Sequence, residues 1–73
     1  MRSKTFTILI ERDEDDVFIG TVPALPGCHS QAKTVPLLLK RIEEAIVLSL
    51  ESGEEFSPLK FVGLQEIEVR ASR

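Results

Sequence analysis

The sequence contains no tryptophan and no tyrosine, and it has only one cysteine and one histidine among its 73 residues. A single cysteine cannot form a disulfide within the chain, which is typical of a protein in the reducing cytosol. No apolar run approaches the roughly 18 residues of a membrane span. The run from Phe6 to Ile10 is also far shorter than the core of a signal peptide. We therefore expect a soluble, cytoplasmic protein.

An excess of positive charge is also lacking. The formal net charge is −3 and the isoelectric point is about 5.0, whereas direct nucleic-acid binding needs a concentrated basic face. Without Tyr or Trp, only the four phenylalanines remain to stack on single-stranded bases. An acidic surface suits a basic protein partner, because complementary charge speeds the encounter. We expect no direct contact with nucleic acid.

The length predicts one small domain over residues 1–73. A chain of this size buries only about 60% of the surface that its unfolded form exposes, so its stability alone is marginal. Since 42% of the residues are apolar and no disulfide is possible, a second subunit is the expected source of further burial. We expect a homodimer or a higher homo-oligomer.

Apolar side chains alternate along residues 5–11, which is the period-2 pattern of a half-buried strand. Charged, turn-forming residues follow at 12–16, and a β-rich composition resumes at 17–22. This order predicts a hairpin with an acidic tip. One face of its first strand is expected to carry Phe6, Ile8 and Ile10.

The stretch VPALPGCHSQAKT, residues 22–34, contains the sharpest local signals. Pro23 should end the second strand because proline cannot donate a ladder hydrogen bond. Pro26 and Gly27 stand at the two central positions of a type II turn, where glycine supplies the positive φ. A short third strand is expected to return over residues 28–31.

Thr34 is a favourable helix N-cap, and apolar residues recur at helical spacing from Val35 to Glu51. Ser52-Gly53 predicts a glycine C-cap. The apolar stripe is wider than one face, and the surplus predicts contact with another chain. The surplus residues are Leu37, Val47 and Leu48.

Residues 61–70 predict a last strand, reached by an irregular crossing over residues 56–59, because Ile67 and Val69 alternate with charged residues. The predicted order is therefore β-β-β-α-β. This is an α+β fold with a mainly antiparallel sheet and one long helix across a face.

The adjacent Cys28 and His29 suggest a nucleophile with its base. Consecutive residues of an extended segment point to opposite faces, however, and a catalytic pair must reach hydrogen-bonding distance. A zinc site needs three or four ligands, and this chain has one Cys and one His. Because free cysteine is commonly buried, we assign Cys28 to the scaffold. His29 remains a candidate for surface contact, with acid–base use as the alternative.

Four consecutive acids form the tip of the predicted hairpin: Asp13, Glu14, Asp15 and Asp16. Carboxylates can bind a hard cation, but the run lacks the spacing and glycine of a calcium loop. It is either a solvated turn or a surface that engages basic side chains of a partner. No glycine-rich phosphate loop or nucleophile motif is present, and we predict no catalytic, cofactor or metal site.

The order of elements and the central motif resemble the N-terminal domain of the HicB antitoxin family. That family has a Pro-x-Leu-Pro-Gly-Cys turn, followed by Ser or Thr, Gln and a Thr that opens a helix. The matching residues are Pro23, Leu25, Pro26, Gly27, Cys28, Ser30, Gln31 and Thr34. The resemblance covers roughly residues 5–70, and it implies a partial ribonuclease H-like fold without nuclease activity.

The resemblance also implies a partner, a small basic HicA-like toxin that cleaves mRNA. The chain would be the antitoxin of a type II toxin–antitoxin system, without the DNA-binding domain that longer relatives carry. The possible partner contacts are Asp13, Glu14, Asp15, Asp16, His29 and Gln31. Two alternatives stay open: an orphan dimeric binding module without a toxin, and a small metal-dependent hydrolase that uses His29 or the acidic turn.

Overall fold

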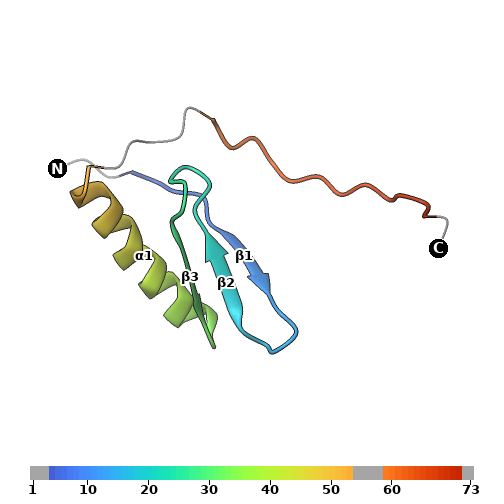
Figure 1. Ribbon diagram of the computed structural model, residues 1–73, viewed down its shortest axis with the longest axis horizontal. Helices are drawn as coiled ribbons and strands as arrows, with labels where there is room; N and C mark the ends of the chain where they lie inside the picture. Colours follow the sequence, from blue (N-terminus) through green and yellow to red (C-terminus); the bar gives the residue numbers. More distant parts are fainter. Residues whose placement is uncertain (1–3, 54–58, 72–73) are drawn as a thin grey trace.

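The computed structural model of the chain describes residues 4–53 and 59–71. A three-stranded antiparallel sheet is followed by one helix, which confirms the α+β fold and the order β-β-β-α (Figure 1). The strands lie in chain order across the sheet, so β2 is central and β1 and β3 are its edges. The elements are β1 Leu9–Arg12, β2 Phe18–Thr21, β3 His29–Ala32 and α1 Val35–Glu51.

A tight acidic loop joins β1 to β2. The Asp16 N–H donates to the Asp13 carbonyl at 3.1 Å, and the Asp13 N–H donates to the Val17 carbonyl at 2.9 Å. Asp16 has φ 61°, the left-handed conformation that ends a three-residue hairpin loop, and aspartate tolerates it better than most residues. The register places Glu11 opposite Ile19 and Leu9 opposite Thr21.

The connection from β2 to β3 is held by three backbone hydrogen bonds. Val22 N–H donates to Cys28 O at 3.0 Å, and Leu25 N–H donates to Val22 O at 3.1 Å. The Cys28 N–H donates to Leu25 O at 3.0 Å across Pro26 and Gly27. Gly27 has φ 82°, so the turn has the hydrogen bond and the positive φ of type II.

Helix α1 has the ends that its sequence indicates. The Thr34 side-chain oxygen accepts a hydrogen bond from the Leu37 N–H at 3.3 Å, which satisfies one of the first-turn donors. At the other end Ser52 is the C-cap, and Gly53 follows it with φ 81°. Within the described residues, no helix is long and apolar enough to cross a membrane.

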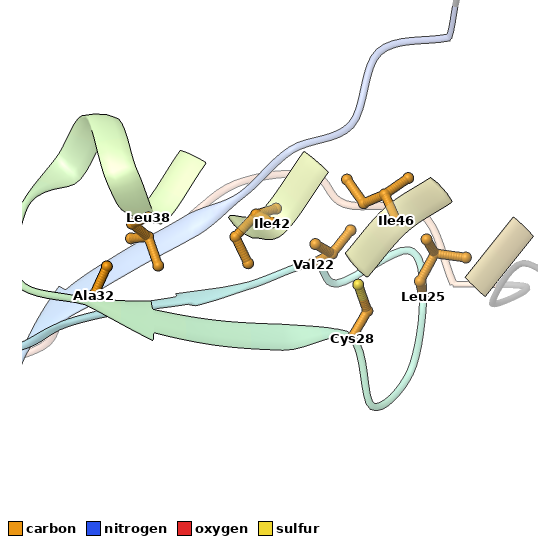
Figure 2. Packing of buried hydrophobic residues seen from close by; sticks show 7 residues of the cluster. All are labelled: Val22, Leu25, Cys28, Ala32, Leu38, Ile42 and Ile46. Atoms are coloured by element: carbon orange, nitrogen blue, oxygen red, sulfur yellow. The ribbon is translucent and has the colours of Figure 1, made fainter. Parts of the chain in front are cut away.

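The core lies between one face of the sheet and α1 (Figure 2). Helix residues Leu38, Ile42 and Ile46 are one turn apart and bury one stripe of α1. They meet four buried residues from β3 and the connection that precedes it: Val22, Leu25, Cys28 and Ala32. Phe6 and Ile8, in the segment that leads into β1, pack against this cluster from the side.

The predicted last strand is not formed. Residues 59–71 include no strand and are exposed throughout, and Figure 1 shows them running away from the sheet. Alternating side chains make a segment suitable for a strand, but a strand also needs a neighbour to pair with, and residues 60–71 pair with no strand among the described residues. The predicted irregular crossing around Phe56 lies largely outside the described residues.

The first strand is shorter than predicted, Leu9–Arg12 instead of residues 5–11. Leu9 pairs with Thr21, and the chain then leaves the sheet through Val22 and the turn before β3. Strand β2 therefore does not extend opposite residues 5–8, and these residues lie outside β1.

Candidate functional site

The sheet has one face covered by α1 and one face that the helix leaves open. Gly20 identifies the covered face, because a Cβ built on it would lie 3.2 Å from Ile42 side-chain atoms. Successive strand residues point to opposite faces. Phe18 and Val22 therefore share the covered face with Gly20, and Ile19 and Thr21 point away from the helix.

Two rows of residues cross this open face. In one row Glu11 pairs with Ile19, which pairs with Gln31; in the other Leu9 pairs with Thr21, which pairs with His29. The outer residues Glu11, His29 and Gln31 are exposed, and the remaining three are partly exposed. We call this set the open face: Leu9, Glu11, Ile19, Thr21, His29 and Gln31.

The open face carries both apolar and polar side chains. Ile19 lies on the central strand and Leu9 on the edge strand β1, and the other four residues are polar or charged. Protein–protein interfaces likewise combine apolar and polar side chains. The structure thus brings together His29 and Gln31, two of the residues expected to contact a partner, and adds the apolar neighbours that a stable contact needs.

The acidic hairpin tip lies at one end of the sheet, beyond the pairs of Arg12 with Phe18 and Phe18 with Ala32. Its acids have different local roles. Asp13 Oδ1 accepts hydrogen bonds from the N–H groups of Asp15 at 2.8 Å and Val17 at 3.0 Å, so this carboxylate shapes the loop. Asp16 Oδ1 lies 3.8 Å from Arg12 Nε, an exposed pair worth little to stability.

Glu14 and Asp15 are the acids of this loop whose side chains remain available to contact a partner. Both are exposed, and neither side chain makes a hydrogen bond or ion pair with the described part of the chain. The charge at the tip can therefore be changed without removing the hydrogen bonds of Asp13. Among the described residues, no group of three or more His, Cys, Asp or Glu side chains is placed to hold a metal ion.

Cys28 and His29 do not form a pair. The Cys28 side chain is 4% exposed, and Figure 2 shows its sulfur on the side of α1. His29 is exposed, and the alternation of β3 places it on the open face. The thiol belongs to the core, and the imidazole is available to a partner.

Sequence reasoning missed Leu9, Ile19 and Thr21 as parts of a surface. A signal was available in Gly20, because a glycine within a strand often marks the close approach of another element. If Gly20 is taken as the position that faces the helix, the alternation of side chains along β2 places both of its neighbours on the opposite face.

Comparison with known proteins finds a family model and several relatives. A family model described as a HicB_like antitoxin of a bacterial toxin–antitoxin system matches residues 6–67. A UPF0150 protein of Archaeoglobus fulgidus is 46% identical over 65 residues, which cover 89% of this chain and 94% of the relative.

Two further relatives carry the same family name. A UPF0150 protein of Synechocystis is 45% identical over 69 residues, covering 94% of this chain and all of the relative. A UPF0150 protein of Thermotoga maritima is 37% identical over 68 residues, covering 90% of this chain and 91% of the relative. No solved structure matches the chain.

Proposed function

Because the chain belongs to the HicB-like antitoxin family, we propose that it neutralises a HicA-like, mRNA-cleaving toxin by binding it. The observation that carries this proposal is the family match over residues 6–67, which includes all three strands and α1. Neutralisation by binding requires an accessible surface and no chemistry of the antitoxin's own. The proposed function is therefore non-enzymatic.

The open face and the acidic tip form the proposed contact surface for the toxin. The open face supplies apolar area around Ile19 that becomes buried on binding, which is the main source of affinity. Glu14 and Asp15 supply negative charge at the end of the sheet, where they attract a basic protein and help to orient it. Both features act on the same partner because a toxin that binds RNA presents a basic surface.

The first experiment is co-expression with the product of the neighbouring gene, if that gene encodes a small basic protein. We expect the product alone to arrest growth, and this chain to restore growth and to co-purify with it. A neighbouring protein that is neither toxic nor bound would refute the proposed function and favour an orphan binding module.

The second experiment locates the contact surface. We expect Glu14→Gln with Asp15→Asn to weaken toxin binding about twofold to thirtyfold, as two exposed charge contacts of about 0.2–1 kcal/mol each would do. The loss should be in the association rate and should shrink at high salt. Binding is measured by biolayer interferometry at two salt concentrations.

The matched control is Glu44→Gln with Glu51→Gln, which removes the same charge from exposed positions of α1. We expect the control to bind almost as the unmodified chain does. An equal loss in both variants would show that net charge matters and the acidic tip does not. His29→Ala tests the open face in the same assay, and unchanged affinity there would remove His29 from the contact.

A further inference from the structure

The C-terminal segment, residues 59–71, leaves an unusual amount of apolar surface in water. Its six large apolar side chains are between 41% and 95% exposed. They are Leu59, Phe61, Val62, Leu64, Ile67 and Val69. A soluble domain rarely leaves so continuous a run of apolar residues uncovered unless another molecule binds there.

The backbone of residues 60–71 forms no ladder with the described part of the chain. From residue 60 to residue 71, no backbone hydrogen bond connects it to the described parts of the chain, and Gln65 bonds only to its neighbour's carbonyl. The radius of gyration is 14.8 Å, whereas a compact chain of this length has about 11 Å. Residues 61–70 are extended and pair with none of the described strands, and their side chains alternate from residue 65 onward, which are the properties of a strand that lacks its neighbour.

The two edges of the sheet differ in their ability to accept such a strand. In β3 the outward carbonyl of Gln31 already accepts a hydrogen bond from Arg41 Nη1 of α1 at 2.8 Å. Helix α1 packs on β3 and β2 and makes no comparable contact with β1. The edge formed by β3 is therefore partly occupied, and the edge formed by β1 is open.

The hydrogen bonds of the hairpin identify the groups on the open edge. Asp13 N–H bonds to Val17 O, and ladder bonds in an antiparallel pair alternate along the strand. Leu9 and Glu11 therefore direct their backbone groups towards β2. The backbone N–H and C=O groups of Ile10 and Arg12 point outward, where a further strand would bond to them.

A mainly apolar hollow, which Lys4 and Glu43 also line, lies beside this edge between α1 and the segment leading into β1. Phe6 and Ile8 line one side, and Leu39, Val47 and Leu50 of α1 line the other. These three helix residues are 41–48% exposed. A strand added outside β1 would direct every second side chain into this hollow, as Ile67 and Val69 could do together.

We propose that residues 61–70 pair as a strand with the outer edge of β1 in a second copy of the chain, and that the two copies exchange these segments reciprocally. Within one copy the segment leaves the edge of β1 unused (Figure 1). In a pair of copies each segment gains a hydrogen-bonded neighbour, and each hollow gains a cover. Of the surplus apolar residues on α1, Val47 lines this hollow and would be covered by the same contact.

The first test measures the mass of the full chain in solution by sedimentation and by light scattering after gel filtration. We expect a dimer at micromolar concentration. Ile67→Pro removes an N–H and an apolar side chain from a residue that is 81% exposed, so it should not unfold the single copy. We expect it to give a monomer with unchanged helical circular dichroism, and the control Ile67→Val to remain a dimer.

A second test separates exchange from pairing within one chain. Ile10→Pro removes an outward N–H of β1 and spares the bonds to β2, since proline is tolerated at a sheet edge. Ile10→Pro and Ile67→Pro should each be monomeric alone, with native circular dichroism. When mixed they should form a heterodimer, because one copy supplies an intact segment and the other an intact edge. The two variants have the same mass, so one of them is labelled with ¹⁵N, and native mass spectrometry then distinguishes the heterodimer from either homodimer.

Three results would overturn the proposal. They are a monomeric unmodified chain at all concentrations, a dimer that survives Ile67→Pro, and folded variants that form no heterodimer when mixed. If Ile10→Pro does not fold, Arg12→Pro replaces it, because Arg12 also directs its N–H outward. The tests require no toxin, so their failure would leave the proposed antitoxin function intact.

Discussion

The contact between Gly20 and α1 gives the most direct test of how the core is packed. A Cβ at this position would lie 3.2 Å from Cδ1 and Cγ1 of Ile42 and 3.3 Å from Cδ1 of Leu38. Apolar carbons pack best at about 3.5–4.0 Å, so the helix side chains must move by a few tenths of an ångström. Gly20 does not have a positive φ, so alanine meets no backbone strain there and the cost is one of packing alone.

The size of the effect follows from two opposing contributions. Overfilling a packed core costs about 1–3 kcal/mol, and Leu38 and Ile42 have no exposed surface through which to relax. Replacing glycine by alanine restricts the unfolded chain, which contributes about 0.4–1 kcal/mol of stability. We expect Gly20→Ala to lower the free energy of unfolding by about 1–2 kcal/mol. With a urea m-value of about 1 kcal/mol/M, the unfolding midpoint should fall by about 1–2 M.

A double-mutant cycle isolates the contact. Ile42→Val removes the Cδ1 atom and should by itself cost about 0.5–1.5 kcal/mol. Combined with Gly20→Ala it should cost less than the sum of the two, by about 0.5–1 kcal/mol, because part of the overlap is gone. Gly63→Ala is the control, since no atom lies within 4 Å of a Cβ there. All variants are unfolded at one protein concentration, because dimer formation would shift the midpoint.

Two results would refute this reasoning. If Gly20→Ala were as stable as the unmodified protein, the helix would not be packed against β2 as the distances indicate. If the effects of the two substitutions on the free energy of unfolding were additive, the side chain of Ile42 would not be the neighbour that the new methyl group overlaps.

The remaining predictions concern the turn between β2 and β3. Gly27→Val should lower the free energy of unfolding by about 1–2 kcal/mol through backbone strain alone, since φ is 82° and no atom lies within 4 Å of a Cβ. Thermal unfolding should show a lower midpoint, with Gly27→Asn much less affected, and equal midpoints would exclude the strained turn. Cys28→Ser should cost about 1–3 kcal/mol because it buries a hydroxyl at a position 4% exposed. Toxin binding by the folded variant should be unchanged, and lost binding would give the thiol a role beyond packing.

The parts of the fold that were predictable are those determined by neighbouring residues. Thr34 starts α1 because its own side chain accepts the Leu37 N–H. Gly27 has its positive φ because the turn between Leu25 and Cys28 requires it. Such interactions span three or four residues, so the local sequence contains all the information needed.

The parts that were not predictable depend on what lies across from a segment. Residues 5–8 have the same alternation as β1, yet the chain opposite them has already turned away after Val22. Residues 61–70 have the composition of a strand, and they pair with no edge of the sheet in the described part of the chain. The sequence predicts the capacity to form a strand, whereas pairing depends on the rest of the fold and, as we propose here, on a second molecule.

The open face and the edge of β1 are adjacent, and this has a consequence for how dimer formation and toxin binding combine. A strand paired outside β1 lies in the plane of the sheet, so it would extend the open face beyond Leu9 and Glu11 without covering it. In the segment 61–70, the charged side chains that point away from the hollow are Glu66, Glu68 and Arg70, two negative charges and one positive charge. Exchange would therefore add negative charge to the face proposed to meet a basic toxin. A dimer would present two such faces and would bind two toxin molecules, and the monomeric Ile67→Pro variant should bind one toxin with lower affinity.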